Sequence, residues 1–292
     1  MKILLIGANG QLGSDLSRIF DRKWHNVVSA DHATFDVCDA KQVDEIVGTE
    51  KPDVILNTAA FHQVEQCETQ PLRAFEVNAV GALNLARACA RSRAVLVHFS
   101  TDYVFDGQKK IPYEESDLPG PINVYGASKV AGENLIAGNT KRYFIVRTCG
   151  LYGHAGSSGK GRNFVETMLR KAAQGDTIRV VNDQVLAPTS TADLARAVSQ
   201  LIGTEEFGLY HISCEDDCSW YQFAREIFAL QKIQVDLVPV KTKDFPSPVK
   251  RPAYSVLSKS RLRGLGLSMP HWSDSLDRYL RARIEKNQAV SF

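Results

Sequence analysis

The 292-residue sequence contains no run of about 18 apolar residues, which is the length that a membrane-spanning helix needs. Its first ten residues, MKILLIGANG, hold an apolar run too short for a signal peptide, and no cleavage site follows. The net charge of +2 gives no excess of positive charge for binding nucleic acid. These absences predict a cytoplasmic globular protein whose partners are neither membranes nor nucleic acids.

The sequence also lacks metal-site spacing among its six cysteines. Cys214 and Cys218 are the nearest pair, in CEDDC, and a metal site would need further ligands. We therefore expect free thiols and no bound metal.

Short apolar segments alternate with helical patterns in the first half of the chain, which predicts an α/β fold. Strands that are apolar throughout are typical of a parallel sheet covered on both faces. We therefore predict a Rossmann-type doubly wound parallel sheet in residues 1–150, with a returning segment near 185–205, and a smaller C-terminal substrate-binding domain in residues 151–292. The predicted strands are residues 2–7, 26–30, 52–60, 94–100 and 143–148, and the predicted helices include 11–20, 71–91, 164–174 and 220–230.

Three other local features are predicted in the C-terminal half. Thr191 is expected to cap a helix. Residues 154–162 are rich in glycine and serine, so we expect a loop that is weakly ordered alone and closes over a substrate. Residues 243–257 are expected to form a loop because prolines interrupt them.

The segment GANGQLG places Gly7, Gly10 and Gly13 between the first strand and its helix. Glycines there permit a tight turn and a close approach of the backbone to a pyrophosphate, which the helix N-terminus attracts. The alternative is a plain glycine-rich turn. The strand–turn–helix context favours a dinucleotide site.

Two carboxylates follow the second strand. Asp31 stands 18 residues beyond Gly13, where a carboxylate accepts from the adenosine ribose and repels a 2′-phosphate. Because no arginine follows in DHATFD, the sequence favours NADH over NADPH. Asp36 is predicted to accept from the adenine amino group, or alternatively to cap a helix.

The stretch NVYGASKVAGE holds Tyr125 and, four residues on, Lys129. Side chains at this spacing share a helix face. A tyrosine can protonate a carbonyl oxygen after hydride transfer if a cation lowers its pKa, which is ordinarily about 10. We expect Lys129 to lower that pKa and to hold the nicotinamide ribose. Thr101 follows the fourth strand and could donate to the same carbonyl oxygen. Thr101, Tyr125 and Lys129 are the predicted catalytic residues.

The chain resembles the dTDP-4-dehydrorhamnose reductase family of the extended short-chain dehydrogenase/reductase superfamily. The resemblance covers essentially the whole chain and rests on motifs including GANGQLG, STDYVFDG, NVYGASKVAGE, VNDQVLAPTSTADLA, SWYQFAREIF and RPAYSVL. It implies reduction of the C4 carbonyl of dTDP-4-dehydro-L-rhamnose to dTDP-L-rhamnose. It also leaves a homodimer open. The cofactor contacts, from the resemblance and the glycine turn together, are Gly7, Gly10, Gln11, Leu12, Gly13, Asp31, Asp36, Val37, Ala59, Ala60, Phe61, His62, Tyr125 and Lys129.

The substrate contacts expected from the same reasoning are Thr101, Asp102, Gly150, Asn163, Phe164 and Arg251, the last as a cation for the diphosphate. The family usually has a tryptophan where this chain has Gly150, in RTCGLYG. The segment AAFHQVE also departs from the family pattern. We expect Tyr152 or Phe61 to fill the space of the missing tryptophan; the alternative is a wider and less selective pocket.

Two other functions stay open on the sequence. One is a reductase or epimerase of another nucleotide-linked keto sugar, since an epimerase would use the same tyrosine and lysine. The other is a non-catalytic regulatory subunit of the same superfamily, against which the intact set of Thr101, Tyr125 and Lys129 argues.

Overall fold

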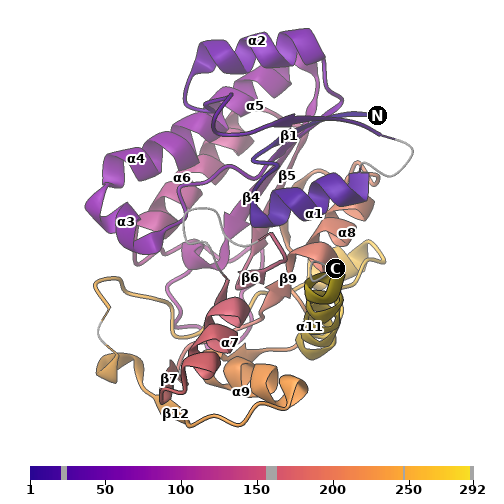
Figure 1. Cartoon of the computed structure of the whole chain (residues 1–292). Coiled ribbons are helices and arrows are strands. Elements are labelled where there is room, and N and C mark those ends of the chain that lie inside the picture. Colours follow the sequence, from indigo (N-terminus) through magenta and orange to yellow (C-terminus); the bar gives the residue numbers. More distant parts are fainter. Residues whose placement is uncertain (21–24, 156–162, 246, 290–292) are drawn as a thin grey trace.

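A computed structural model describes residues 1–20, 25–155, 163–245 and 247–289. Its largest sheet has six parallel strands in the order β10, β5, β4, β3, β1, β2. The order reverses between β1 and β3, which makes the carboxyl ends of these two strands the expected ligand site. Figure 1 shows this sheet in the upper part of the molecule. The strands are β1 (Lys2–Ile6), β2 (Asn26–Ala30), β3 (Val54–Asn57), β4 (Val95–Thr101), β5 (Tyr143–Thr148) and β10 (Gly208–His211).

A second, lower part packs around its own hydrophobic core (Figure 1). Its main elements are α7 (Phe164–Gln174), β7 (Ile178–Val181), α9 (Trp220–Gln231), β12 (Leu237–Val240) and α11 (Trp272–Ala289). The shorter elements of the chain include α3 (Val64–Thr69), η2 (Asp102–Val104), β6 (Leu151–Tyr152), β8 (Val185–Leu186), β9 (Thr189–Ser190), β11 (Cys218–Ser219), η3 (Thr242–Asp244) and α10 (Ser260–Gly264).

The chain passes between the two parts more than once. It leaves the upper part after β5 and returns to it as α8 (Thr191–Leu201) and then as β10, which pairs in parallel with β5. The return therefore extends beyond the predicted segment 185–205. The predicted domain boundary near residue 150 stays a prediction.

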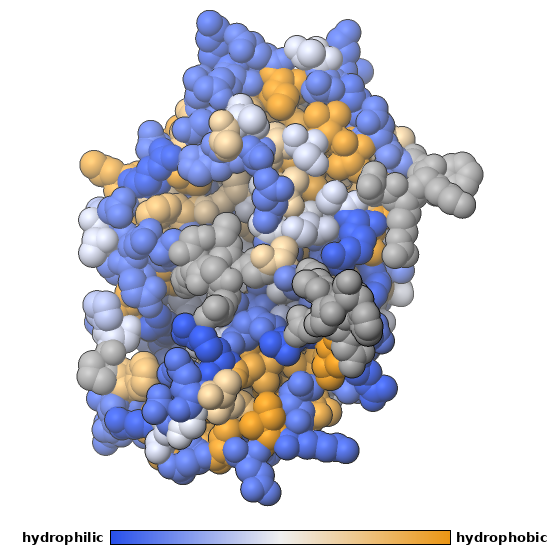
Figure 2. Space-filling view, in the orientation of Figure 1, coloured by the Kyte–Doolittle hydropathy of each residue, from blue (hydrophilic) through white to orange (hydrophobic). Residues whose placement is uncertain are grey.

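Figure 2 shows polar side chains around the middle of one face, and hydrophobic ones gathered lower down, over α7 and α9. No helix among the described residues combines the length and the apolar character needed to cross a membrane.

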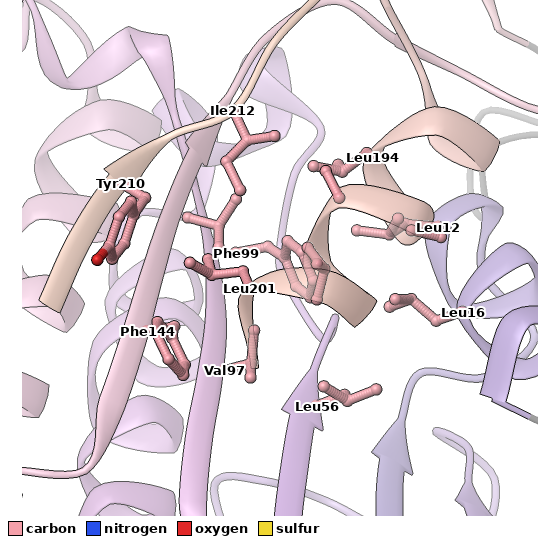
Figure 3. Close-up of a cluster of buried hydrophobic side chains, with 14 of the residues drawn as sticks. Leu12, Leu16, Leu56, Val97, Phe99, Phe144, Leu194, Leu201, Tyr210 and Ile212 are labelled. Atoms are coloured by element: carbon pink, nitrogen blue, oxygen red, sulfur yellow. The ribbon is translucent and has the colours of Figure 1, made fainter. Parts of the chain in front are cut away.

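Helices cover both faces of the six-stranded sheet. On one face lie α1 (Gln11–Phe20) and α8 (Thr191–Leu201), whose leucines pack against the strands. Figure 3 shows Leu12 of α1 and Leu194 of α8 near Phe99 of β4. On the other face lie α2 (Ala40–Glu50), α5 (Gly81–Ser92) and α6 (Val124–Asn139). Every residue of β3 and β4 is buried, which explains why these strands are apolar almost throughout. The predicted α/β fold is confirmed.

The single helix predicted over residues 71–91 is wrong in its middle. The structure has α4 (Pro71–Phe75), then a π turn, η1 (Glu76–Val80), then α5. The π turn carries the fully buried Asn78, whose amide exchanges two hydrogen bonds with the backbone of Phe61 and donates to Ser128 Oγ. The π turn thus coincides with a buried, hydrogen-bonded polar side chain, which hydrophobic periodicity does not reveal.

The predicted cap at Thr191 is displaced by one residue. Ser190 occupies the N-cap position without a side-chain capping bond, and Thr191 is the first helical residue. The Thr191 hydroxyl instead donates to Asp15 of α1 over 2.5 Å. It therefore ties α8 to α1 rather than closing the helix end.

Candidate active site

The turn between β1 and α1 has no room for a side chain at Gly7 or at the position of Gly13. Gly7 has a φ of 79°, and a Cβ there would lie 2.5 Å from Thr58 Oγ1. A Cβ on Gly13 would lie 2.1 Å from the carbonyl oxygen of Gly7. The backbone thus forms a bare cradle at the N-terminus of α1, which fits the diphosphate of a dinucleotide.

A first cavity of about 350 Å³ lies beside this cradle. Gln11 and Leu12 line a second cavity instead. Gly13 packs against Gly7 and lines neither cavity. The predicted cofactor residues that line the first cavity are Gly7, Gly10, Asp31, Asp36, Val37, Ala59, Ala60, Phe61 and His62.

The Asp31 carboxylate is held in place by local donors. It accepts from Asn9 Nδ2 over 2.9 Å, and from the backbone nitrogen of Ala33 and the hydroxyl of Thr34. Arg73 of α4 lines the same cavity. The prediction from DHATFD considered only the residues next to Asp31, and so missed a cation supplied from 42 positions away in the sequence (73 − 31).

The alternative of a helix cap at Asp36 is wrong, since Asp39 caps α2 by accepting from the backbone nitrogens of Lys41 and Gln42. Asp36 instead accepts from the backbone nitrogen of Cys38 over 2.9 Å, which is the main reason that its pKa is lowered. Asp36 therefore faces the first cavity as an anion.

The second cavity, of about 370 Å³, continues from the first. The two share Gly10, Thr58, Ala60 and His62 on their walls. The predicted substrate residues that line it are Thr101, Asp102, Gly150, Asn163 and Phe164, so that only Arg251 of the predicted set does not. The predicted catalytic residue Tyr125 also lines this cavity.

The polar groups at the centre of the second cavity are already bonded to one another. The Thr101 hydroxyl donates to Asp102 Oδ1 over 3.0 Å, and Ser255 donates to Asp102 Oδ2 over 2.5 Å. Burial raises the pKa of Asp102 to about 6 despite these bonds. Burial also raises the pKa of Tyr125, with a further rise from the Asp102 charge, while a hydrogen bond with Thr101 opposes both. Tyr125 is therefore a phenol, not a phenolate, in this state.

Lys129 does not line either cavity. It is fully buried, and its Nζ lies 3.0 Å from Nε2 of His98 on β4. Burial lowers the pKa of Lys129 to about 8. Lys129 and Tyr125 both lie on α6. The expectation that Lys129 supplies a cation next to Tyr125 stays a prediction.

The helix that carries Tyr125 is fixed to the sheet by a buried ion pair. Glu133 of α6 binds Arg147 of β5 through both oxygens, at 2.6 and 3.0 Å, and also accepts from Ser100 of β4. At the N-terminus of α6, the Asn123 side chain accepts from the backbone nitrogen of Gly126. These bonds set the height of Tyr125 above the sheet.

Gly150 adopts a left-handed conformation with a φ of 56°, and a Cβ there would lie 2.8 Å from Leu186 Cδ1. The expected replacements for the family tryptophan are wrong. Tyr152 is buried in the lower core against Phe223 and Tyr279, and Phe61 lines the first cavity. The aromatic wall of the second cavity comes from Trp220 and Phe164, whose rings lie 4.5 Å apart.

Asn163 lies on the wall of the second cavity, but its hydrogen bonds are used within the protein. Its Oδ1 accepts from the backbone nitrogen of Glu166 to cap α7, and its Nδ2 donates to Gly153 and to Tyr279. The predicted closing loop falls largely on residues 156–162, which lie outside the described residues. His154, just before them, stacks on Tyr279 at 4.4 Å.

A third cavity, of about 530 Å³, adjoins the second through Phe164 and Trp220. Arg251 lines it and is held by Glu65 and by Ser247, the latter over 2.6 Å. Two further cations, Lys171 and Arg179, lie on its wall. The predicted cation at Arg251 thus lies with two others, beside the aromatic wall.

Sequence reasoning missed Trp220, His98, Arg73, Lys171 and Arg179. Trp220 stands within SWYQFAREIF, a motif used for the family resemblance but not assigned to a site. His98 lies inside an apolar strand and resembles a core residue. The three cations reach the cavities from separate helices and strands, so that spacing gives no signal for them.

Residues 1–284 match the family described as the RmlD substrate binding domain. The chain belongs to this family. The resemblance found in the sequence motifs is therefore confirmed.

Proteins and solved structures similar to the chain match nearly its whole length. The spore coat polysaccharide biosynthesis protein SpsK of Bacillus subtilis is 40% identical over 97% of this chain and 98% of its own. The dTDP-4-dehydrorhamnose reductase of Aggregatibacter actinomycetemcomitans is 36% identical over 97% and 99%. The structure of the Bacillus anthracis dTDP-4-dehydrorhamnose reductase in complex with NADP is 39% identical, covers 96% of this chain and 99% of that one, and gives a TM-score of 0.92.

Proposed function

We propose that this protein reduces the C4 carbonyl of dTDP-4-dehydro-L-rhamnose to give dTDP-L-rhamnose, with a nicotinamide cofactor as reductant. The observation that carries the proposal is the continuity of the three cavities. The glycine turn lies beside the first cavity, and Thr101 and Tyr125 line the second. Three cationic side chains line the third cavity. This continuity supports binding of the cofactor, the reacting carbonyl and the diphosphate in neighbouring parts of one connected space.

The residues of the first cavity would hold the cofactor. The cradle of Gly7, Gly10 and Gly13 would receive the diphosphate, and Asp31 and Asp36 would accept from the adenosine. When bound, the nicotinamide supplies the hydride for the carbonyl carbon. The surrounding chain provides the orientation and excludes water.

Tyr125 would supply the proton that the carbonyl oxygen needs. Its raised pKa keeps the proton on the phenol until the oxygen gains charge. Thr101 donates to Asp102 in this structure, so it must turn away from that carboxylate to donate to the substrate oxygen. Protonation of Asp102, whose pKa lies near 6, would release Thr101 for that turn.

The third cavity would bind the nucleotide end of the substrate. Arg251, Lys171 and Arg179 supply positive charge for a diphosphate. We propose that Trp220 takes the role of the family tryptophan that Gly150 replaces, since it forms the wall beside Leu186.

For the cofactor we propose a preference for NADH over NADPH, supported by the Asp31 carboxylate in the first cavity. Arg73 on the same wall supports additional use of NADPH.

A homodimer is also proposed, and light scattering on the purified protein tests it.

The decisive experiment measures NADH and NADPH oxidation with dTDP-4-dehydro-L-rhamnose and with a panel of other nucleotide-linked keto sugars. We expect the fastest turnover with the named substrate and a product reduced at C4. Faster turnover of another keto sugar would overturn the named substrate. Tightly bound NAD that co-purifies and is regenerated in each cycle would indicate an epimerase. No turnover on any sugar, together with capture of a large enzyme partner, would indicate a regulatory subunit.

A further inference from the structure

A buried histidine lies behind the tyrosine–lysine pair and takes no part in the mechanism given above. His98 lies in the middle of β4, between Asn57 of β3 and Lys129 of α6. Its Nδ1 is 3.0 Å from Asn57 Nδ2, and its Nε2 is 3.0 Å from Lys129 Nζ. The three residues are at most 2% exposed, so they are shielded from bulk solvent.

A backbone hydrogen bond to Asn57 fixes which group donates and which accepts in the contacts between Asn57, His98 and Lys129. The amide nitrogen of Ala59 donates to Asn57 Oδ1 over 3.1 Å. Because a backbone N–H can only donate, the carboxamide oxygen faces Ala59 and the NH₂ group faces His98. Asn57 therefore donates to Nδ1 of His98, and a neutral imidazole in this position carries its proton on Nε2.

That proton points at Lys129. An ammonium group has three donors and no acceptor, so it cannot accept a hydrogen bond from Nε2–H. A neutral amine has a lone pair and can. The 3.0 Å contact is thus a hydrogen bond only when Lys129 is uncharged.

The surrounding charges allow a neutral amine. Glu133, from α6 itself, is the carboxylate nearest to this contact along the helix, and Arg147 of β5 neutralises it through both oxygens. Of the other elements packed against α6, the π turn presents the neutral Asn78, α3 carries Glu65 and Glu68, and η2 carries Asp102. The charge that acts on the pKa of Lys129 is that of Glu133.

Burial acts in the same direction on both titrating groups. It lowers the pKa of Lys129 to about 8, against an opposing effect of Glu133. It also lowers the pKa of His98 well below the ordinary value, with the Lys129 charge as a further cause. The imidazole is therefore neutral, as the hydrogen-bond polarity requires.

We propose that Asn57 and His98 hold Lys129 as a neutral amine in the cofactor-free protein above about pH 8, and that His98 is the positioning residue that sets its protonation. In that pH range Lys129 gains its charge only when its amine leaves Nε2 for the cofactor side of α6. The cation expected beside Tyr125 then arrives with the cofactor, and a proton is taken up from solvent.

Two measurements on the full-length protein test this without any sugar substrate. The first is nitrogen NMR of histidine-labelled, cofactor-free protein, with the His98 signals assigned by their loss in His98→Gln. At pH 9 we expect a neutral imidazole protonated on Nε2, and the Nε2 signal should change as pH falls below 8, where Lys129 gains its proton. The opposite tautomer at pH 9, or a charged imidazole there, would overturn the proposal.

The second measurement is calorimetry of NADH binding in buffers of different ionisation enthalpy, and it rests on the proposed cofactor binding. At pH 9 we expect uptake of about one proton per NADH, because the pKa of Lys129 would rise from about 8 toward the ordinary value of about 10.4. The uptake should shrink as pH falls below 8, where the free protein already binds that proton. Binding without proton uptake at pH 9 would contradict the neutral amine, whereas absence of NADH binding would refute the proposed function instead.

Asn57→Asp is the sharpest variant, because it changes one NH₂ group into an oxygen and keeps the acceptor for Ala59. The new carboxylate should accept from Nδ1–H, reverse the tautomer, and let Nε2 accept from a charged lysine. Proton uptake on NADH binding should then be lost. His98→Gln should lose it too, since its carbonyl accepts from an ammonium, and it serves if Asn57→Asp fails to fold. In Tyr125→Phe the uptake should remain, which excludes the tyrosine as the group that titrates. Unchanged uptake in both Asn57→Asp and His98→Gln would refute the role of His98.

Discussion

The first and third cavities are built in opposite ways. The first lies between consecutive strands and helices of the upper part, and its shape is made by backbone that has no room for side chains at Gly7 and Gly13. The third is assembled from segments between residues 64 and 251, and its character comes from the side chains of Trp220, Phe164 and Arg251. From this contrast we expect substitutions in the glycine turn of the first cavity to abolish NADH binding. Substitutions in the third cavity should change only the KM for the sugar nucleotide.

The largest effect should come from filling the cradle. In Gly13→Ala the new Cβ would lie 2.1 Å from the carbonyl oxygen of Gly7, so the turn must open and NADH binding should be lost. Gly48→Ala in α2 is the matched control, because a Cβ there meets nothing within 4 Å. The control should bind NADH normally and unfold at higher temperature, since alanine is more stable than glycine in a helix by ~0.5–1 kcal/mol. Calorimetry and thermal melts check both, and normal NADH affinity in Gly13→Ala would show that the backbone cradle is not needed.

Tyr125→Phe tests the second cavity, which adjoins both of the others. It removes one oxygen from the proposed proton donor, so turnover should fall at least ~10²-fold while NADH affinity stays unchanged. Steady-state kinetics and cofactor titration measure the two separately. Turnover close to that of the wild type would remove Tyr125 from the mechanism.

Trp220→Ala tests the aromatic wall of the second and third cavities. The loss of apolar contact should raise KM for the sugar nucleotide about tenfold, equivalent to ~1.4 kcal/mol, and leave KM for NADH unchanged. Trp220→Phe keeps an aromatic ring beside Phe164 and should show a smaller rise. If both KM values rise together in Trp220→Ala, the residue supports the fold rather than the sugar site.

Arg251→Gln tests the charge of the third cavity. It should raise KM for the sugar nucleotide several-fold, by roughly 1 kcal/mol of lost attraction to a diphosphate, and the rise should shrink in high salt. Arg263→Gln is the control, since Arg263 pairs with Glu215 and lines none of the three cavities. An equal change in both variants would point to overall charge and not to this cavity.

The smallest effect should come from Asp31→Ala, which leaves the backbone cradle in place. Removing the carboxylate should narrow the preference for NADH over NADPH by roughly several-fold. The ratio of kcat/KM for the two cofactors is the measurement. A wild-type protein that strongly favours NADPH would make the assigned role of Asp31 wrong.

The same contrast explains which parts could be predicted from sequence. The glycine turn and the strands could be predicted from local sequence patterns, because the contacts there join residues that are close in the chain or lie on adjacent strands. Tyr125 and Thr101 follow recognisable motifs at strand and helix ends. Trp220 and Arg179 gain their positions only through tertiary packing, and the contact of Lys129 with His98 depends on two side chains buried between a strand and a helix. Such placements leave no periodicity or spacing in the sequence.

The π turn at Glu76–Val80 has a consequence for how this chain can vary in length. A π turn holds one residue more than a regular helix would in the same rise, so it is the natural place for a single-residue deletion to be absorbed. Here the added residue sits beside Asn78, whose amide joins Phe61 on the wall of the first cavity to Ser128 on the catalytic helix. Deleting one residue would restore a regular helix and rotate Asn78 by about 100° away from both partners. The helix would survive the deletion, whereas the connection between the cofactor side and α6 would be cut.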